Sequence, residues 1–300
     1  MNTGHRIAII GAGPAGIACA VQLKRSGITP MVFEQGRIGG LLNNAFLVEN
    51  YPGFPDGISG QSLVNKFNAQ MQRWQIPIVH ELVKAVHLSN KAYILQTTKK
   101  YNADFIVVAS GTKPILPEFG FAIHNDRILY EVYPILRKRK KTVVIIGSGD
   151  AAFDYALNLC RHNRVYIFNL NQNAKALELL QKRAKSAGDK RLIYLKKTWT
   201  KQIRQRCNGF SLVTNRTGKH KTILCNYLLY AIGREPALDF LGSSLRKQTA
   251  RARNLYYIGD VKNGDKRQTS IAVGDGVKTA MEIVAVLRGN GETVRVSSKD

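Results

Sequence analysis

The stretch Ile7-Ala8-Ile9-Ile10-Gly11-Ala12-Gly13-Pro14-Ala15-Gly16 decides the fold of this chain. Its short apolar run predicts a buried β-strand, its glycines predict a tight turn, and a helical pattern follows as far as Leu23. Small residues at such a turn let the backbone approach a pyrophosphate, and the N-terminus of the next helix offers free N–H groups and a partial positive charge. The stretch therefore predicts a strand–turn–helix unit that binds a dinucleotide.

A second copy of this pattern begins 136 residues further on, where Val143-Val144-Ile145-Ile146 precedes Gly147-Ser148-Gly149-Asp150-Ala151-Ala152. One such motif alone is also typical of an ordinary glycine turn at a strand end. Two copies in the same context argue against that alternative, and alanine is an accepted residue in place of the third glycine. We therefore predict an α/β protein with two Rossmann-like dinucleotide-binding domains, one inserted in the other.

The two copies differ at the end of their second strands. The first copy reaches Met31-Val32-Phe33-Glu34, and an acid about 20 residues past the glycines is suited to bind a pair of ribose hydroxyls. Glu34 is therefore our predicted ribose ligand. The second copy reaches Asn169-Leu170-Asn171, with neither an acid nor a pair of arginines, so its nucleotide preference stays open.

The composition is that of a folded protein with room for two cores. The chain has 300 residues, of which 44% are hydrophobic and 22% charged. Its apolar runs are short and no signal-peptide pattern opens the sequence, so we expect a cytoplasmic protein without a transmembrane segment. The four cysteines, Cys19, Cys160, Cys207 and Cys225, form no CxxC pair, so we expect neither a metal site nor a local redox pair.

The charge is unusual, with 45 basic against 20 acidic residues and a net of +25. Residues 116–237 carry 23 Lys and Arg against 8 Asp and Glu, so the middle of the chain is the more basic part. Such a field attracts acidic partners, which include nucleic acid, membrane phosphates and acidic electron-transfer proteins. A solvated basic surface with no partner is the alternative.

The order of the motifs predicts a discontinuous first domain, residues 1–115 and 238–300, with a second domain, residues 116–237, inserted in it. Pro114 and Pro236 lie at the two crossings, each shortly after a glycine.

Several further motifs match those of one family of flavoproteins. They are Gly39-Gly40-Leu41-Leu42, Val48-Glu49-Asn50-Tyr51-Pro52-Gly53, Phe105-Ile106-Val107-Val108-Ala109-Ser110-Gly111, Ala231-Ile232-Gly233-Arg234-Glu235-Pro236, Leu255-Tyr256-Tyr257-Ile258-Gly259-Asp260 and Arg267-Gln268-Thr269. With these motifs the chain resembles the low-molecular-weight thioredoxin reductase-like flavoproteins over nearly its whole length. The resemblance implies FAD in the first domain, NADH or NADPH in the inserted domain, and a homodimer.

The resemblance also implies which residues bind the cofactors. It places Asn50 beside the isoalloxazine ring, Asp260 at the ribityl chain, and the backbone of Val83 at the adenine. Residues 267–269 would meet the pyrimidine end of the flavin, where the N-terminus of the next helix favours the negative charge of reduced flavin. The FAD-binding set is Gly11, Gly13, Pro14, Ala15, Gly16, Glu34, Gly39, Gly40, Leu42, Asn50, Val83, Ala109, Gly111, Gly259, Asp260, Arg267, Gln268 and Thr269, and the NAD(P)H-binding set is Gly147, Gly149, Asp150 and Ala152.

The chain departs from the family in its redox pair and in the run that would bind the 2′-phosphate of NADPH. The family's CxxC pair would fall within residues 126–134, which contain no cysteine, so no internal dithiol relay is expected. In this respect the chain is most similar to ferredoxin–NAD(P) reductases of thioredoxin reductase type. The arginines that grip the 2′-phosphate of NADPH are replaced by the run Asn169-Leu170-Asn171-Gln172-Asn173-Ala174-Lys175, which favours NADH. A domain that binds no nicotinamide stays open as an alternative.

We therefore expect an oxidoreductase that passes electrons from NADH through FAD to an acidic acceptor such as a ferredoxin or another iron–sulfur protein. No catalytic acid, base or nucleophile is expected, because the cofactor supplies the redox chemistry. Two alternatives remain: an atypical disulfide or small-molecule reductase, and a flavin-binding sensor or scaffold that binds nucleic acid or a membrane through its basic surface. The basic runs look scattered in the sequence, which does not favour a nucleic-acid surface.

Overall fold

The computed structural model describes residues 4–89, 92–117, 125–188, 191–243, 245 and 254–289. The chain forms two compact units. Unit 1 consists of Met1–Asn43, Glu49–Lys113 and Glu235–Asp300, and unit 2 consists of Asn44–Val48 and Pro114–Arg234. Each unit contains its own parallel sheet with helices, which confirms the predicted α/β fold with two Rossmann-like domains.

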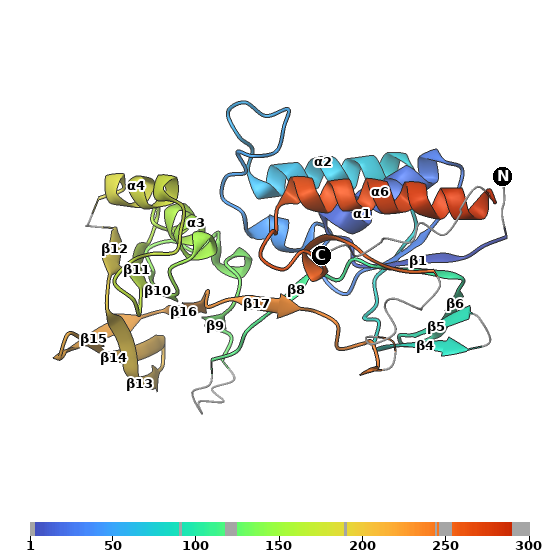
Figure 1. Cartoon of the computed structure of the whole chain (residues 1–300). Coiled ribbons are helices and arrows are strands. Elements are labelled where there is room, and N and C mark those ends of the chain that lie inside the picture. Colours follow the sequence, from blue (N-terminus) through green and yellow to red (C-terminus); the bar gives the residue numbers. More distant parts are fainter. Residues whose placement is uncertain are drawn as a thin grey trace, which may run out of the picture. The chain divides into compact units, whose positions relative to one another are not determined.

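Unit 1 is built in three layers around a five-stranded parallel sheet (Figure 1). The sheet has the order β18 (Leu255–Tyr257), β7 (Phe105–Val108), β1 (Ile7–Ile10), β2 (Met31–Phe33) and β3 (Ile78–Val79). One face packs against the helices α1 (Pro14–Arg25), α2 (Gly60–Arg73) and α6 (Thr269–Leu287). The other face packs against the antiparallel strands β4 (Ala85–Ser89), β5 (Ala92–Gln96) and β6 (Lys100–Ala103).

The continuous apolar runs of the sequence follow from this layering. Ile7 and Ile9 of β1 lie in the cluster formed with the helices, whereas Ala8 and Ile10 lie in the cluster formed with the antiparallel strands. All four side chains are buried. A strand covered on both faces has no solvent side, so its sequence does not alternate between apolar and polar residues.

Unit 2 repeats the three layers of unit 1. Its parallel sheet has the order β12 (Leu192–Leu195), β11 (Arg164–Phe168), β10 (Thr142–Ile146), β16 (Tyr227–Tyr230) and β9 (Ile128–Leu129). The helices α3 (Asp150–Leu159) and α4 (Glu178–Ser186) cover one face. The antiparallel strands β13 (Thr198–Arg206), β14 (Gly209–Arg216) and β15 (Lys219–Cys225) complete the unit, and β14 and β15 supply apolar side chains to the other face.

Short elements connect these layers. β8 (Thr112–Pro114) and β17 (Arg234–Pro236) pair with each other where the chain passes from one unit to the other. Three short turns of 3₁₀ helix are η1 (Gly40–Asn44), η2 (Tyr133–Ile135) and η3 (Gly259–Val261). Among the described residues, no helix combines the length and the apolar character that crossing a lipid bilayer requires.

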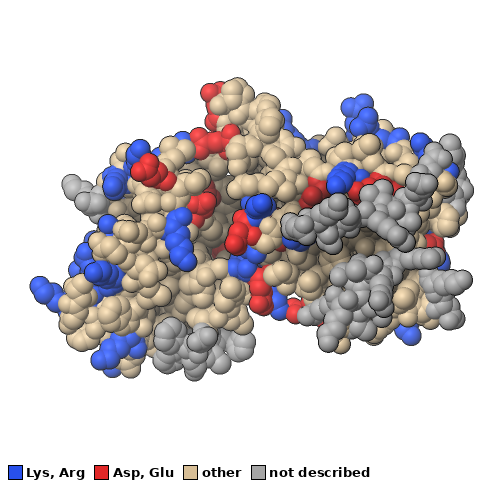
Figure 2. Space-filling view, in the orientation of Figure 1, with Lys and Arg blue, Asp and Glu red and all other residues tan. Residues whose placement is uncertain are grey.

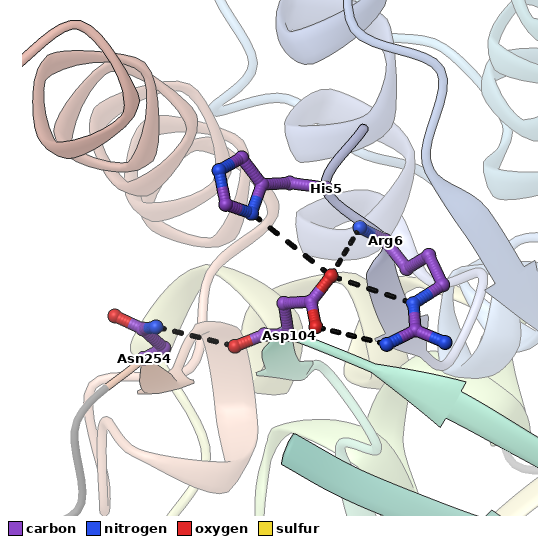
Figure 3. Close-up of polar contacts among 4 residues, drawn as sticks. All are labelled: His5, Arg6, Asp104 and Asn254. Carbon is purple, nitrogen blue, oxygen red and sulfur yellow. Dashed lines mark hydrogen bonds and ion pairs between the residues drawn. The ribbon is translucent and has the colours of Figure 1, made fainter. Parts of the chain in front are cut away.

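Asp104 lies at the edge of the unit 1 sheet where the parallel strands begin, and it links the residues that precede two neighbouring strands (Figure 3). Its carboxylate accepts hydrogen bonds from the backbone N–H of Arg6 at 2.8 Å and from the Arg6 guanidinium at 3.0 Å. Asn254 donates to the backbone carbonyl of Asp104 at 3.2 Å, and His5 lies 4.0 Å from the carboxylate. The side-chain hydrogen bond from Arg6 is the main cause that lowers the pKa of Asp104. The Arg6 cation at this edge is therefore balanced by a carboxylate.

Candidate dinucleotide-binding sites

The first glycine loop of unit 1 requires glycine at its first position. Gly11 has φ +109°, and its N–H donates to the carbonyl of Phe33 at 2.8 Å. A Cβ at Gly11 would lie 2.3 Å from the carbonyl oxygen of Ala109. Any side chain here would force β1 and β7 apart, so this glycine sets the close approach of the loop to the sheet.

The same loop leaves open space where a pyrophosphate would lie. A Cβ at Gly13 would have nothing within 4 Å, whereas a Cβ at Gly16 would lie 2.0 Å from the Gly11 carbonyl oxygen. Pro14 and Ala15 open α1, and no side chain caps the helix at Gly13. The uncapped N–H groups and the space beside Gly13 fit a phosphate group.

Glu34 follows β2 directly and is bound to the glycine loop. One carboxylate oxygen accepts the N–H of Ala12 at 2.8 Å and the other accepts the N–H of Gly36 at 2.7 Å. The predicted ribose ligand therefore lies beside the loop on which a dinucleotide would bind, with its orientation fixed by two backbone donors.

The Gly39–Gly40 segment packs onto the same loop. The N–H of Gly39 donates to the carbonyl of Ala12 at 2.7 Å, and a Cβ at Gly39 would clash with Val64 on α2. A Cβ at Gly40 would lie 3.7 Å from the Cα of Gly13. Leu42 follows in η1 and is buried. The structure thus brings these predicted residues to the first glycine loop.

Asn50 and Gln268 are 218 residues apart and meet in unit 1. The side-chain amide of Asn50 donates to the Gln268 side-chain oxygen at 2.7 Å, and the hydroxyl of Ser270 donates to the carbonyl of Asn50 at 3.1 Å. Arg267 directly precedes Gln268 in the sequence. Thr269 is the first residue of α6, and no side chain caps this helix N-terminus. The predicted isoalloxazine contacts therefore gather at one helix N-terminus.

Gly259 and Asp260 lie in η3, which packs against α1. Gly259 has φ +73°, and a Cβ there would lie 2.8 Å from the Cβ of Ala15. Its N–H donates to a carboxylate oxygen of Asp275 at 3.0 Å, and the Asn263 side chain donates to the same oxygen at 2.7 Å. Sequence reasoning missed Asp275, which holds the turn that carries Asp260. Its only signal in the sequence was an acid about two turns into a helix that also carries Lys278 and Glu282.

The remaining FAD-set residues lie at the carboxyl end of β7 and in the core. The N–H of Ala109 donates to the Ile10 carbonyl at 2.9 Å, and Gly111, with φ +66°, accepts the N–H of Ala237 at 3.0 Å. The side chain of Val83 is 4% exposed within the core. Only the backbone of Val83 is therefore suited to contact a cofactor.

The second glycine loop, in unit 2, repeats the geometry of the first. The N–H of Gly147 donates to the Phe168 carbonyl at 3.0 Å, its φ is +139°, and a Cβ there would lie 2.2 Å from the carbonyl oxygen of Ala231. A Cβ at Gly149 would again meet nothing within 4 Å. Ala152 is fully buried at the third position. This cradle also fits a pyrophosphate.

The segment of residues 175–177 closes over this second loop. The backbone N–H groups of Lys175 and Ala176 both donate to the carbonyl of Ser148, at 2.9 and 3.0 Å. Asp150, the first residue of α3, accepts the N–H of Leu177 at 2.8 Å. Asp150 therefore positions the loop between β11 and α4, in addition to any contact with a nucleotide.

Asn169 holds the position in unit 2 that Glu34 holds in unit 1, directly after the second strand of the unit. Its side chain is 1% exposed. The amide donates to the Asn173 carbonyl at 3.0 Å and to the Tyr194 hydroxyl at 2.7 Å, and the oxygen accepts the N–H of Asn171 at 2.9 Å. Asn169 therefore shapes this loop from inside.

The four cysteines form no disulfide bond and differ in their exposure to solvent. Cys19, Cys160 and Cys225 are buried, and Cys207 is exposed. Burial raises the pKa of the Cys19 and Cys160 thiols and raises that of Cys225 to about 12. In the described part of the chain, no group of three or more His, Cys, Asp or Glu residues is placed to hold a metal ion.

Comparison with known proteins agrees with this geometry. The family described as pyridine nucleotide-disulphide oxidoreductase matches residues 5–284. Thioredoxin reductase of Chlamydia pneumoniae is 27% identical over 92% of this chain and 97% of its own length. Thioredoxin reductase 2 of Arabidopsis thaliana is 28% identical over 92% of this chain and 80% of its own length.

A solved structure shows the same fold. The crystal structure of Lactococcus lactis thioredoxin reductase in its FR conformation superposes with a TM-score of 0.84 at 25% identity, covering 95% of this chain and 99% of that one. The family uses FAD and NAD(P)H, and each of the two glycine loops described above fits a dinucleotide. The chain therefore belongs to the pyridine nucleotide-disulphide oxidoreductase family, as an NAD(P)H-dependent flavin oxidoreductase of the thioredoxin reductase type.

Proposed function

We propose that this enzyme passes electrons from NADH through FAD to a protein acceptor without using an internal dithiol. The observation that carries the proposal is that the glycine loops at Gly11 and Gly147 make the same close approach to a neighbouring strand end, in a chain whose four cysteines form no CxxC pair. Two loops provide for two dinucleotides, and the missing pair removes the route that a dithiol relay would use. The acceptor then takes its electrons from the flavin.

The FAD site in this proposal belongs to the domain made of residues 1–115 and 238–300. Glu34 would bind ribose, Gly13 and Pro14 the pyrophosphate, and Asp260 the ribityl chain. Asn50 and Gln268 would hold the isoalloxazine ring through their mutual contact at the start of α6. Bound FAD would accept a hydride and release electrons singly.

The nicotinamide nucleotide would bind the domain of residues 116–237, through Gly147, Gly149, Asp150 and Ala152. We favour NADH over NADPH because Asn169 is used inside its own loop and Lys175 is the one basic residue in the run 169–175. A 2′-phosphate is usually held by two or more guanidinium groups.

The acceptor in this proposal is an acidic iron–sulfur protein such as a ferredoxin. A net charge of +25 would speed its encounter with an acidic partner and would make the rate fall with added salt. The resemblance to ferredoxin–NAD(P) reductases, which also lack CxxC, supports this choice, and the family resemblance supports a homodimer.

The proposal is tested by anaerobic mixing of the flavin-loaded protein with NADH or NADPH, followed at the visible band of oxidised flavin. We expect fast bleaching with NADH and bleaching at least about tenfold slower with NADPH. A second step adds oxidised ferredoxin or, in a parallel sample, oxidised thioredoxin. Return of the flavin band with ferredoxin alone supports the proposal, whereas return with thioredoxin alone, or no bleaching by either nucleotide, contradicts it.

A further inference from the structure

The strands of the unit 2 sheet begin at one edge, and basic side chains line that edge. Lys141 precedes β10, Arg164 opens β11 and Arg191 precedes β12. Because neighbouring strands in a parallel sheet lie about 4.8 Å apart, these three positions form a row. We call residues 137–141 together with Arg161, His162, Arg164 and Arg191 the basic edge.

The buried residue Asn163 and one backbone hydrogen bond hold two segments of the basic edge together. The side chain of Asn163 is 5% exposed, accepts the N–H of Lys141 at 3.0 Å and donates to the carbonyl of Lys138 at 3.0 Å. The N–H of Lys140 donates to the carbonyl of His162 at 2.9 Å. Lys140 has φ +55°, a conformation that a non-glycine residue adopts only when its surroundings require it. The arrangement is therefore fixed by the fold.

Two guanidinium groups of the basic edge are anchored to backbone carbonyls. Arg191 donates to the carbonyl of Arg161 at 3.0 Å, and Arg139 donates to the carbonyl of Leu136 at 2.9 Å. No residue of the basic edge forms an ion pair with a carboxylate of the described residues. Each guanidinium carries five N–H donors, so both keep donors for an anion.

The edge of unit 1 that corresponds to the basic edge has a carboxylate at a position where unit 2 has an amide. In unit 1, the backbone N–H of Arg6 donates to the carboxylate of Asp104 at 2.8 Å (Figure 3). In unit 2, the backbone N–H of Thr142 donates to the side-chain oxygen of Asn226 at 2.9 Å. The two bonds link the corresponding strands, β1 with β7 and β10 with β16. An uncharged amide therefore stands where unit 1 has its balancing carboxylate.

The sequence around the basic edge adds to its charge. Residues 132–149 and 155–177 contain no Asp or Glu. Desolvation, and then the charges of Arg139, Arg161 and Arg191, lower the pKa of His162. A protonated imidazole is disfavoured there by the field of these neighbours, and a bound anion would reverse that effect.

The basic edge is separate from the second glycine loop. Lys141 lies before β10 and Gly147 lies after it, with the five residues of the strand between them. Lys141 and Gly147 are six residue steps apart, so at about 3.3 Å per residue they lie roughly 20 Å from each other. The basic edge is therefore not part of the nucleotide site in unit 2.

The chemistry of the basic edge suits a linear polyanion better than a protein. Protein interfaces place large apolar or aromatic side chains at their centre. Among the described residues, no exposed large hydrophobic side chain lies within residues 132–168 or 191–198, the segments that form and flank the basic edge. Contacts with a phosphate backbone need cations and little else, and one strand of B-DNA carries one phosphate charge for about every 3.4 Å of helix axis. We propose that the basic edge binds the phosphate backbone of nucleic acid without reading its base sequence.

A matched control comes from another basic surface of unit 2. Figure 2 shows Lys and Arg side chains also over the strands β13–β15, where Lys201, Arg204 and Lys219 are exposed. The triple variant K201Q/R204Q/K219Q removes three charges there. The triple variant R137Q/K138Q/K140Q removes three charges from the basic edge, at exposed side chains that make no hydrogen bond, ion pair or ring contact with the described residues. Both variants change the net charge equally.

The test is fluorescence anisotropy of a labelled, mixed-sequence single strand of about 20 nucleotides, titrated with the flavin-loaded oxidised protein. We expect the basic-edge variant to bind about tenfold more weakly and to lower the salt-dependence slope by about 2. The control variant should change the dissociation constant less than about threefold. Equal losses in both variants would show that net charge alone drives binding, and would overturn the proposal.

Two further readouts locate the contact and the partner. Saturating DNA should raise the pKa of His162 in a proton NMR titration, and an unchanged His162 would contradict binding at this edge. Polyglutamate of matched charge should compete with the DNA weakly; equal competition would overturn the choice of a nucleic acid. Neither measurement uses nicotinamide nucleotide or an electron acceptor, so the outcome is independent of the proposed function.

Discussion

The carboxylate of Asp154 accepts the backbone N–H of Phe46 at 2.8 Å, across 108 residues of sequence. Asp154 lies on α3, and Phe46 belongs to the short segment Asn44–Val48 that joins unit 2. The Phe46 ring packs against the apolar core of unit 2, with the guanidinium of Arg161 5.8 Å from the ring centre. Desolvation by burial raises the pKa of Asp154 to about 6, and the hydrogen bonds from Phe46 and Leu47 only partly oppose this.

This contact predicts a pH-dependent stability. Between the unfolded pKa of Asp154, about 4, and the folded pKa of about 6, the folded state binds more protons than the unfolded state. Stability should therefore fall as the pH rises through this window, by up to about 3 kcal/mol. D154N removes the charge and keeps an oxygen for Phe46, so urea unfolding of the variant should show a flatter curve from pH 4 to 7. Parallel curves for the two proteins would contradict the assignment.

The two kinds of glycine in the first loop predict two kinds of defect. G11A places a Cβ 2.3 Å from the Ala109 carbonyl at φ +109°, so the flavin-free protein should lose about 2 to 4 kcal/mol of stability. G13A meets open space at φ −76°, so its flavin-free form should keep the wild-type Tm while it retains FAD at least about tenfold more weakly. Thermal unfolding and flavin release measure the two effects. Equal losses of Tm in G11A and G13A would contradict the assignment of a folding role to Gly11 and a binding role to Gly13.

Glu34 should act on FAD affinity more than on folding. E34Q keeps one oxygen acceptor but turns an amide group toward the N–H of Ala12 or Gly36, and it loses the charge that a ribose hydroxyl pair favours. We expect FAD to bind about ten to a hundred times more weakly, measured by fluorescence on titrating flavin-free protein.

N169D is the corresponding variant in unit 2. Because the Asn169 side chain is buried and hydrogen-bonded, N169D should lower the stability of the protein without improving the KM for NADH.

The Asp104 contact at the start of the unit 1 sheet predicts acid sensitivity. The Asp104 pKa is lowered, mainly by the Arg6 side chain, so its stabilising effect is present at neutral pH and is lost as the pH falls through the folded pKa. D104N should lower Tm by about 2 °C at pH 7, since partly exposed ion pairs contribute little. The difference between wild type and variant should shrink at acid pH, as the pH falls through the lowered pKa of Asp104. Differential scanning calorimetry over a series of pH values from 7 downward checks this.

Thiol reactivity separates the four cysteines. Cys207 is exposed, whereas burial raises the pKa of Cys19, Cys160 and Cys225, which keeps their reactive thiolates scarce. Native protein should react with one equivalent of a chromogenic disulfide reagent and unfolded protein with four. C207S should abolish the native reaction and leave reduction of the flavin by NADH unchanged. Loss of that reduction would indicate a thiol in the electron path.

The order of motifs in the sequence was enough to predict the fold class and the pair of glycine loops. The reason is local: an apolar run, glycines at φ values that other residues avoid, and a helix N-terminus all lie within ten residues. The position of Glu34 beside its loop was predictable for the same reason. Its placement follows from one β-α-β unit.

Only the tertiary structure decided which distant residues share a site. It joined Asn50 to Gln268, brought Asp275 to Gly259, and placed Asn169 inside its own loop. The contacts Asn50–Gln268, Gly259–Asp275 and Asn169–Tyr194 join residues 218, 16 and 25 positions apart, and such contacts depend on how loops, helices and strands pack.

The charge shows the same division between sequence and structure. The sequence alone determined that the chain is strongly basic, with its basic residues in separate runs. The parallel sheet of unit 2 aligned the starts of β10, β11 and β12, so that residues 137–141, 161–164 and 191 lie at one edge. Asn226 leaves that edge without the carboxylate that Asp104 supplies in unit 1. The composition determines the net charge, whereas the strand order and register determine which of the charged residues lie next to one another on the surface.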